Sequence, residues 1–180
     1  MNFCSHCGSA SISFIVPEGD SYQRFVCEKC GKIFYENPRL IVGCLVDQNN
    51  RILLCKRAIK PRLGLWNLPA GFLENGESVE KGAARETLEE SLAQVEIIKL
   101  HAVFSLPQVD QVYLHFLAKL LPGEIGPTAE SSEVRLFSHS EIPWDDIAFH
   151  STTFALKKYL EYGKDHQGVH IGEYNKREKW

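Results

Sequence analysis

The sequence lacks the features that mark membrane-spanning and secreted proteins. Its 180 residues contain no apolar run close to the length of a membrane span. The first ten residues, MNFCSHCGSA, have neither the basic nor the apolar region of a signal peptide. The net charge of −3 gives no general attraction to nucleic acid or to anionic membranes. We therefore expect a soluble cytoplasmic protein without a nucleic-acid or membrane partner.

The six cysteines are not spaced like a disulfide framework. Cys4 and Cys7 form one C-x-x-C pair, Cys27 and Cys30 form another, and nineteen residues separate the two pairs. This spacing predicts a four-cysteine structural Zn²⁺ site, and the glycine after each pair allows a tight turn. The alternatives are a redox role for either pair and a single iron in the same thiolate cage.

The cysteine pairs define a small N-terminal module over residues 1–36. Two short apolar runs, Ser11–Val16 and Gln23–Cys27, predict a hairpin between them. So few residues cannot build a sufficient core, so the bound metal would supply folding free energy. Residues 37–180 are expected to form a second, larger domain.

The larger domain has strand and helix patterns in alternation. Strand-like runs are Leu40–Asp47, Arg51–Arg57, Val95–Ser105, Gln111–Leu121 and Val134–Ser138. Helical periodicity covers Val79–Leu92 and Thr152–Tyr162. We expect an irregular connection over residues 58–68, a turn over 71–76 and a polar tail after Gly163. Strands mixed with two helices predict an α/β sandwich.

The first helix has a predicted N-cap at Ser78. Its buried face is expected to consist of apolar positions at helical spacing: Val79, Ala83, Ala84, Leu88 and Leu92. Glu86 and Glu90 are expected to lie off that face. Because residues three and four apart share a side of a helix, Glu86, Glu89 and Glu90 gather like charges. A hard divalent cation, Mg²⁺ or Mn²⁺, would stabilise such a carboxylate cluster.

These glutamates follow a longer pattern. Gly71, five residues, Glu77, seven residues and then Arg85-Glu-Thr-Leu-Glu-Glu90 together resemble the signature box of the Nudix hydrolase family. A solvated helix face with internal ion pairs is the alternative for the last six residues alone. Leu92 departs from the family pattern, which has a glycine there that helps the helix to end.

The resemblance implies a Nudix α/β/α sandwich with a mixed sheet, preceded by a zinc ribbon. It also implies hydrolysis of a diphosphate linked to another group. Site residues carry over by position, and the metal ligands would be Glu86, Glu89, Glu90 and a backbone carbonyl of Ala70 or Gly71. Glu77 and Arg85 would pair and orient the ligand helix.

Further residues are candidates for catalysis and substrate binding. The general base is Glu89, Glu130 or Glu133, because the family often supplies a glutamate from the segment TAESSEVRLF. Arg57 and Arg62 could bind phosphates, with a surface charge as the alternative for each. Trp66 or Phe104 could stack on a base, although an aromatic residue beside an apolar strand is more often part of the core.

Two Nudix groups carry such an N-terminal zinc ribbon. The NADH pyrophosphatases, which also act on NAD-capped RNA, have a Ser-Gln-Pro-Trp-Pro-Phe type motif, whereas this chain has Phe104-Ser-Leu-Pro-Gln-Val109. The chain looks closer to ADP-ribose/FAD pyrophosphatases. The segments that carry this likeness are Phe34–Pro38, Leu65–Glu74, Val134–Phe137, Glu141–Pro143 and Tyr174–Arg177. It implies FAD or ADP-ribose as substrate, AMP as one product and a homodimer. A non-catalytic nucleotide-sensing regulator is a further alternative.

Overall fold

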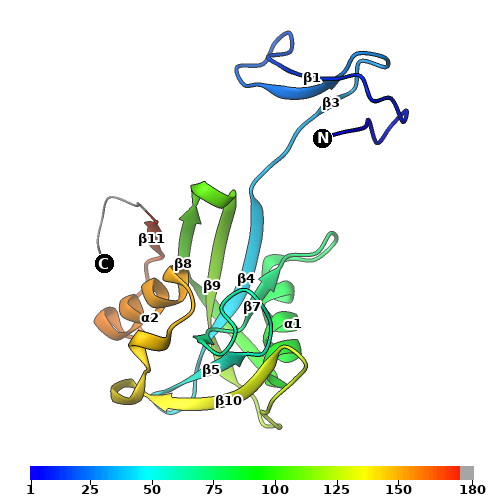
Figure 1. The fold of residues 1–180 in the computed structure, drawn as a ribbon. Coiled ribbons are helices and arrows are strands. Elements are labelled where there is room, and N and C mark those ends of the chain that lie inside the picture. Colours follow the sequence, from blue (N-terminus) through cyan, green and yellow to red (C-terminus); the bar gives the residue numbers. More distant parts are fainter. Residues whose placement is uncertain (175–180) are drawn as a thin grey trace. The chain divides into compact units, whose positions relative to one another are not determined.

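The computed structural model describes residues 1–174, and their contacts form two compact units (Figure 1). The first unit is Met1–Asn37 and the second begins at Pro38. Of the Tyr174–Arg177 segment, Tyr174 is described and residues 175–177 lie outside the described range. No helix of the described residues is long and apolar enough to cross a membrane.

The first unit is a three-stranded antiparallel sheet. Its strands are β1 (Ile12–Ile15), β2 (Arg24–Cys27) and β3 (Ile33–Phe34), in that order. Strands β1 and β2 confirm the expected hairpin, and β3 is an additional two-residue strand. Cys4 and Cys27 are buried, whereas Phe14 and Tyr22 are exposed. The cysteines therefore occupy the position that an apolar core has in a larger domain.

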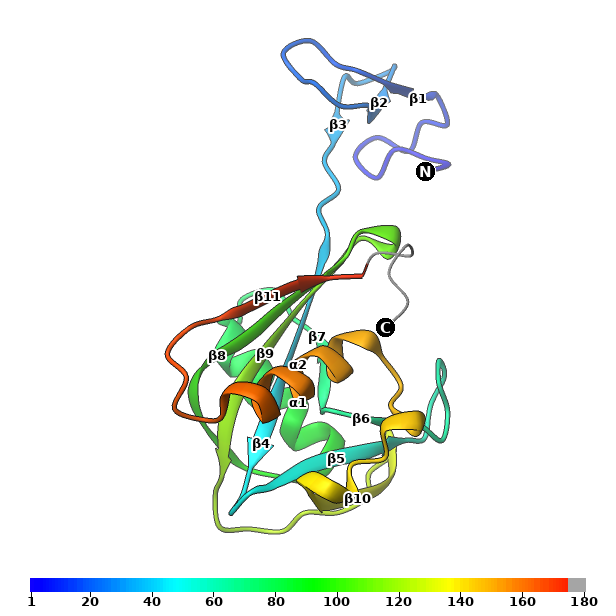
Figure 2. The same cartoon turned by 90° about the vertical axis from the view of Figure 1, so that its left-hand side faces the viewer.

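The second unit is built on a mixed sheet (Figures 1 and 2). Its main path runs β10-β5-β4-β9-β8-β11, with short strands β6 on β5 and β7 on β4. The strands are β4 (Arg39–Asp47), β5 (Arg51–Arg57), β6 (Trp66–Asn67), β7 (Ala70–Phe72), β8 (Val95–Leu106), β9 (Gln111–Leu120), β10 (Ser131–Ser138) and β11 (His170–Glu173). The pairs β4–β9 and β8–β11 are parallel, and the other pairs are antiparallel.

Each face of this sheet has a core and a helix. Strand side chains alternate between faces, so Val42 and Cys44 pack on the side of α1 (Val79–Ser91), whereas Leu45 packs on the side of α2 (His150–Tyr162). Figure 2 shows the two helices on opposite sides of the sheet. Three short 3₁₀ helices complete the unit: η1 (Pro107–Val109), η2 (His139–Glu141) and η3 (Trp144–Asp146). The α/β/α sandwich that the sequence predicts is confirmed.

The buried face of α1 differs from the predicted one. Buried positions are Gly82, Ala83, Thr87, Glu90 and Ser91, whereas Leu88 is 43% exposed and Leu92 is 44% exposed. The prediction was therefore wrong for Leu88, Leu92 and Glu90. Small side chains let the helix approach the sheet closely, since a Cβ on Gly82 would lie 2.8 Å from Leu73 Cδ1. With this face of α1 turned toward the sheet, Glu90 lies against the backbone of Ala70, the first residue of β7.

Both ends of α1 have identifiable caps. The Ser78 side chain accepts a hydrogen bond from the Lys81 N–H, which confirms the predicted N-cap. Leu92 adopts a left-handed conformation, with φ of 61°, and its N–H donates to the Leu88 carbonyl. A leucine therefore takes the backbone conformation that glycine usually supplies at this position.

Candidate active site

Strand β7 brings the backbone of Ala70 and Gly71 against the glutamates of α1. The Ala70 N–H donates to Glu90 Oε2 at 3.4 Å. A Cβ on Gly71 would lie 2.6 Å from Glu86 Oε1 and closer still to Oε2. The absence of a side chain at Gly71 leaves the space that the Glu86 carboxylate occupies.

Arg85 connects the carboxylates of this site. Its Nε donates to Glu77 Oε1 at 2.6 Å and its Nη2 donates to Glu77 Oε2 at 3.0 Å. Its Nη1 donates to Glu86 Oε1 at 2.7 Å and to Glu89 Oε2 at 2.9 Å, and its Nη2 also reaches the Phe72 carbonyl. The two-pronged pair with Glu77 has the geometry that the family resemblance implies, and Arg85 holds the pKa of Glu77 below its ordinary value.

Two of the carboxylates are withdrawn from water. Glu90 is 6% exposed, and burial raises its pKa to about 8, while the charge of Arg57 partly opposes the shift. Burial also raises the pKa of Glu86, and Arg85 opposes that shift. A buried carboxylate with one long hydrogen bond lacks the partner that its charged form needs. These donors fit a hard divalent cation such as Mg²⁺ or Mn²⁺.

The three glutamates do not converge as tightly as the cysteines do. We compared the metal-ligating atoms of the His, Cys, Asp and Glu side chains of residues 1–174. The four cysteine thiols are the one group of three or more in which all of these atoms lie within 4.8 Å of one another. Glu89 is instead exposed on the solvent side of α1, where it meets Arg85. The ligand roles of Glu86, Glu89 and Glu90 therefore stay predictions.

The two other candidate bases differ in their surroundings. Glu133 lies on β10 with Lys56 Nζ at 3.7 Å and Arg135 at 3.9 Å. Glu130 precedes β10, and its carbonyl accepts a hydrogen bond from the Ala58 N–H at 2.7 Å. The charge of Glu130 adds to the effect of burial in raising the pKa of Glu90. The structure thus brings Glu130 to the site and gives Glu133 cationic partners of its own.

The two candidate arginines lie close together in sequence, Arg57 at the end of β5 and Arg62 within the loop that leads to β6. Arg57 ends β5, donates from Nε to the Pro61 carbonyl at 2.8 Å, and has its Cζ 5.1 Å from the centre of the Phe149 ring. Arg62 has a left-handed backbone and lines a groove of about 680 Å³ at the start of α2. The charge of Arg57 reaches Glu90 and lowers its pKa, whereas Arg62 lines the groove.

The two candidate stacking residues are in the core. Trp66 is 6% exposed, and its ring meets Phe137 edge-on at 4.8 Å. Phe104 is 1% exposed and packs against Phe154 at 5.1 Å. These positions agree with the core alternative, and Phe104 also lines a cavity of about 250 Å³ with His150 and Phe154. A stacking role for either residue stays a prediction. Burial in an apolar sheet explains both placements.

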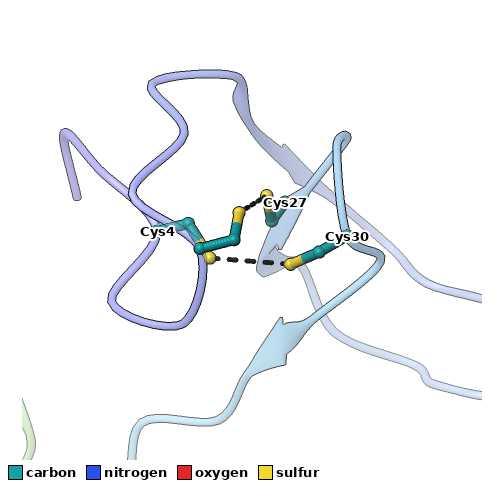
Figure 3. Close-up of side chains that lie close together, drawn as sticks. Cys4, Cys27 and Cys30 are labelled. Carbon is teal, nitrogen blue, oxygen red and sulfur yellow. Dashed lines mark hydrogen bonds between the residues drawn. The ribbon is translucent and has the colours of Figure 1, made fainter.

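The four cysteines of the first unit converge (Figure 3). Cys4 Sγ lies 3.7 Å from Cys30 Sγ, and Cys7 Sγ lies 3.6 Å from Cys27 Sγ. The glycine after each pair has a left-handed backbone, as the sequence predicts. A backbone N–H at Cys30 lowers the pKa of the Cys27 thiol to about 7, which favours the thiolate that a metal binds. The set fits a tetrahedral thiolate site.

Sequence reasoning missed the other residues that line the groove. Trp144, Phe149, His150 and Lys157 come from η3 and α2 and share the groove with Arg62. They are separated by about eighty residues from the loop of Arg62 and show no motif. The exposed aromatic residue in WDDIAFH was the one signal available.

Comparisons with known proteins agree with this geometry. The NUDIX domain model matches residues 37–156, and the Nudix N-terminal model, a zinc ribbon, matches residues 2–36. An ADP-ribose pyrophosphatase of Methanocaldococcus jannaschii is 31% identical over 132 residues, which cover 71% of this chain and 76% of that protein. The NAD-capped RNA hydrolase NudC of Photobacterium profundum is 30% identical over 129 residues, which cover 72% of this chain and 46% of that protein.

Solved structures support the same assignment. The crystal structure of a NUDIX hydrolase from Nitrosomonas europaea has a TM-score of 0.91 and 52% identity, and the match covers 98% of this chain and 100% of that one. An ADP-ribose pyrophosphatase from Streptococcus suis matches with a TM-score of 0.62 and 24% identity, over 77% of this chain and all of that one, which shows the shared fold. The chain spans about half the length of the NudC relatives. It belongs to the Nudix hydrolase family and carries that family's N-terminal zinc ribbon.

Proposed function

We propose that the protein hydrolyses the diphosphate of a nucleoside diphosphate linked to another moiety, with Mg²⁺ or Mn²⁺ as cofactor and ADP-ribose or FAD as substrate. The products would be AMP and either ribose 5-phosphate or FMN. The observation that carries the proposal is the buried Glu90 carboxylate, 6% exposed, facing the Ala70 backbone. Among the described residues, no cationic side chain lies within salt-bridge distance of Glu90. A buried carboxylate without such a partner is suited to bind a metal ion.

The residues of the site divide the work. Glu86, Glu89 and Glu90, with a carbonyl of Ala70 or Gly71, would hold the ion. The bound ion would neutralise charge on the diphosphate and lower the pKa of the attacking water. Glu86 and Glu89 both pair with Arg85 Nη1, and metal binding would weaken these two ion pairs.

Three further residues would orient the metal ligands, accept a proton and bind phosphate. Arg85 remains anchored to Glu77 through two hydrogen bonds, so it fixes the helix that bears the ligands. Glu130, whose charge raises the pKa of Glu86 and of Glu90, would accept the proton of the attacking water, with Glu89 and Glu133 as the alternatives. Arg57, whose charge also reaches Glu90, would contact a phosphate oxygen.

A second substrate class is favoured by the relatives. Several relatives that match at about 30% identity are named NAD-capped RNA hydrolases. The same carboxylates could serve NADH or a capped RNA. The first unit would bind structural Zn²⁺ through its four cysteines. A homodimer remains a proposal from family resemblance.

One panel tests the function. Purified full-length protein is assayed with FAD, ADP-ribose, NADH and NAD-capped RNA, each with Mg²⁺ and with Mn²⁺, and the products are identified by mass. We expect metal-dependent release of AMP, fastest from ADP-ribose or FAD. A preference for NADH or capped RNA would select the second class. Nucleotide binding without hydrolysis of any substrate would support a sensor and refute the enzyme.

A further inference from the structure

A groove of about 680 Å³ lies at the start of α2, outside the carboxylate site. Three segments that are distant in sequence form it: the loop with Arg62, the 3₁₀ helix η3 with Trp144, and the first two turns of α2 with His150 and Lys157. This volume is within the range of pockets that hold small organic ligands. The groove is large enough for a nucleoside.

Strand β6 connects the groove to the carboxylate site, because residues at the start of α2 form hydrogen bonds with it. The Ala148 N–H donates to the Trp66 carbonyl at 2.8 Å, and the Thr152 hydroxyl donates to Asn67 Oδ1. Asn67 is three residues before Ala70, and three extended residues span at most about 10 Å. One short segment therefore carries the start of α2 on one side and the glutamate-facing backbone on the other.

Arg57 makes a second connection. Its guanidinium lies against the ring of Phe149, which lines the groove, at 5.1 Å from the ring centre. The charge of the same residue acts on Glu90. A ligand whose diphosphate meets Glu90 and Arg57 can therefore place an attached group in the groove.

The lining suits an aromatic ligand that carries negative charge. Trp144 and Phe149 contribute rings, and the Trp144 residue is 38% exposed. Arg62 and Lys157 contribute two positive charges against the single carboxylate of Asp145. The first turn of α2 has no side-chain cap, so its N–H groups add positive potential at this end. Stacked rings and cations together are the usual surroundings of a nucleotide base and its phosphate.

We infer that this groove binds the nucleoside half of the substrate, with the base against Trp144, and that Arg62 and Lys157 attract the phosphate of the same diphosphate that adjoins the nucleoside. The inference rests on the proposed function for the diphosphate that lies at the glutamates. It assigns base recognition to η3 and α2 rather than to the buried rings of Trp66 and Phe104. Trp144 is thus a specificity-determining residue.

The test measures binding and turnover separately on the full chain. Isothermal titration with AMP, with no added divalent metal, compares wild type with Trp144→Ala and Arg62→Ala. Trp144→Ala should raise the Kd for AMP about tenfold, since loss of one base–aromatic stack has that effect. Arg62→Ala should also raise this Kd, because it removes a cation from the phosphate. Where ADP-ribose is hydrolysed, its KM should rise by a similar factor while kcat changes less than about threefold.

Two further variants act as controls. Trp144→Phe keeps a ring and should recover most of the affinity, which a purely structural loss would not do. Tyr162→Ala removes another exposed aromatic residue at the far end of α2 and should leave the Kd for AMP unchanged.

The two proposals can fail independently. If no diphosphate is hydrolysed but AMP binding depends on Trp144, the groove is supported as the nucleoside site and the proposed enzymatic function is refuted. If ADP-ribose is hydrolysed but Trp144→Ala leaves both KM and the Kd for AMP unchanged, the groove assignment is overturned. Absence of AMP binding to the wild type also overturns it.

Discussion

Gly71→Ala is the most informative single substitution in this chain. Gly71 has strand backbone in β7, so alanine is compatible with the local conformation. Its new Cβ would lie 2.6 Å from Glu86 Oε1, whereas ordinary van der Waals contact begins at 3.4 Å. The Glu86 carboxylate must therefore move by about 1 Å. One added methyl group thus displaces a proposed metal ligand without changing any charge.

The size of the effect follows from that displacement. A shift of about 1 Å in a catalytic group can lower the rate about 100-fold, which corresponds to about 2.7 kcal/mol in the barrier. The clash involves the end of a flexible side chain, so the melting temperature should fall by less than about 3 °C. The assay is kcat for ADP-ribose at saturating Mg²⁺, together with the Mg²⁺ concentration for half-maximal rate, which should rise.

Gly126→Ala is the matched control. Its Cβ would have one neighbour, Leu92 Cδ1 at 3.7 Å, which is ordinary contact. This variant should keep wild-type kcat. If Gly71→Ala retains a rate within threefold of wild type at the same Mg²⁺ concentration, the Glu86 position does not matter to the reaction and the reasoning is refuted.

Four other predictions follow from the same structure. Arg85→Lys should lower kcat about 10- to 100-fold, because lysine cannot reproduce the two-pronged contact, and steady-state kinetics with ADP-ribose would show it. In the metal-free protein, burial holds the pKa of Glu90 at about 8, above its ordinary 4.5, so the folded state keeps a proton that the unfolded chain releases. Stability should therefore fall as pH rises from about 4.5 to about 8, and melting curves without added Mg²⁺ or Mn²⁺ should show a flatter pH dependence for Glu90→Gln. Elemental analysis should find one Zn²⁺ per wild-type chain and none in Cys27→Ser, and the amide NMR signals of residues 1–37 should broaden in the variant, whereas those of 38–174 persist. Leu92→Gly should raise the melting temperature by about 3 °C, because it relieves about 1 kcal/mol of left-handed strain at a position that is 44% exposed; an unchanged or lower value would contradict this.

The long elements could be predicted from sequence because their periodicity extends over many residues. Strands β4, β5, β8 and β9 begin and end within one residue of the expected ranges. Strands β3, β6, β7 and β11 are two to four residues long, which is too short for an alternating pattern to be recognised. Their positions depend on pairing with distant strands, as β11 does with β8.

The face of α1 shows where local pattern reasoning fails. Apolar spacing places Leu88 inside, but the structure buries Thr87 and Glu90 instead. Small residues at Gly82 and Ala83 decide the contact, because they permit the closest approach to the sheet. Thr87 and Glu90 are thus buried while the larger apolar side chain of Leu88 is exposed.

Spacing was a better guide to the carboxylate site than to the rest of the ligand contacts. The residues from Gly71 to Glu90 belong to one strand, one turn and one helix that follow each other directly. The sequence spacing of these residues therefore determines how close they lie in space. The groove instead combines the loop of Arg62 with η3 and α2, and no local pattern links those segments. The sequence already favours a core position for Trp66 and Phe104, because each stands beside an apolar strand-like run, and the structure buries both rings.

The turnover of Glu90→Gln measures the central claim most directly. Glutamine has nearly the shape of a protonated glutamate, the form that burial favours, so the variant should fold like the wild type. Its kcat for ADP-ribose with Mg²⁺ should be lower by at least about 100-fold, since a neutral amide is a poor ligand for a hard cation. A correctly folded Glu90→Gln protein with kcat within threefold of wild type would contradict the assignment of this site as the metal-dependent centre.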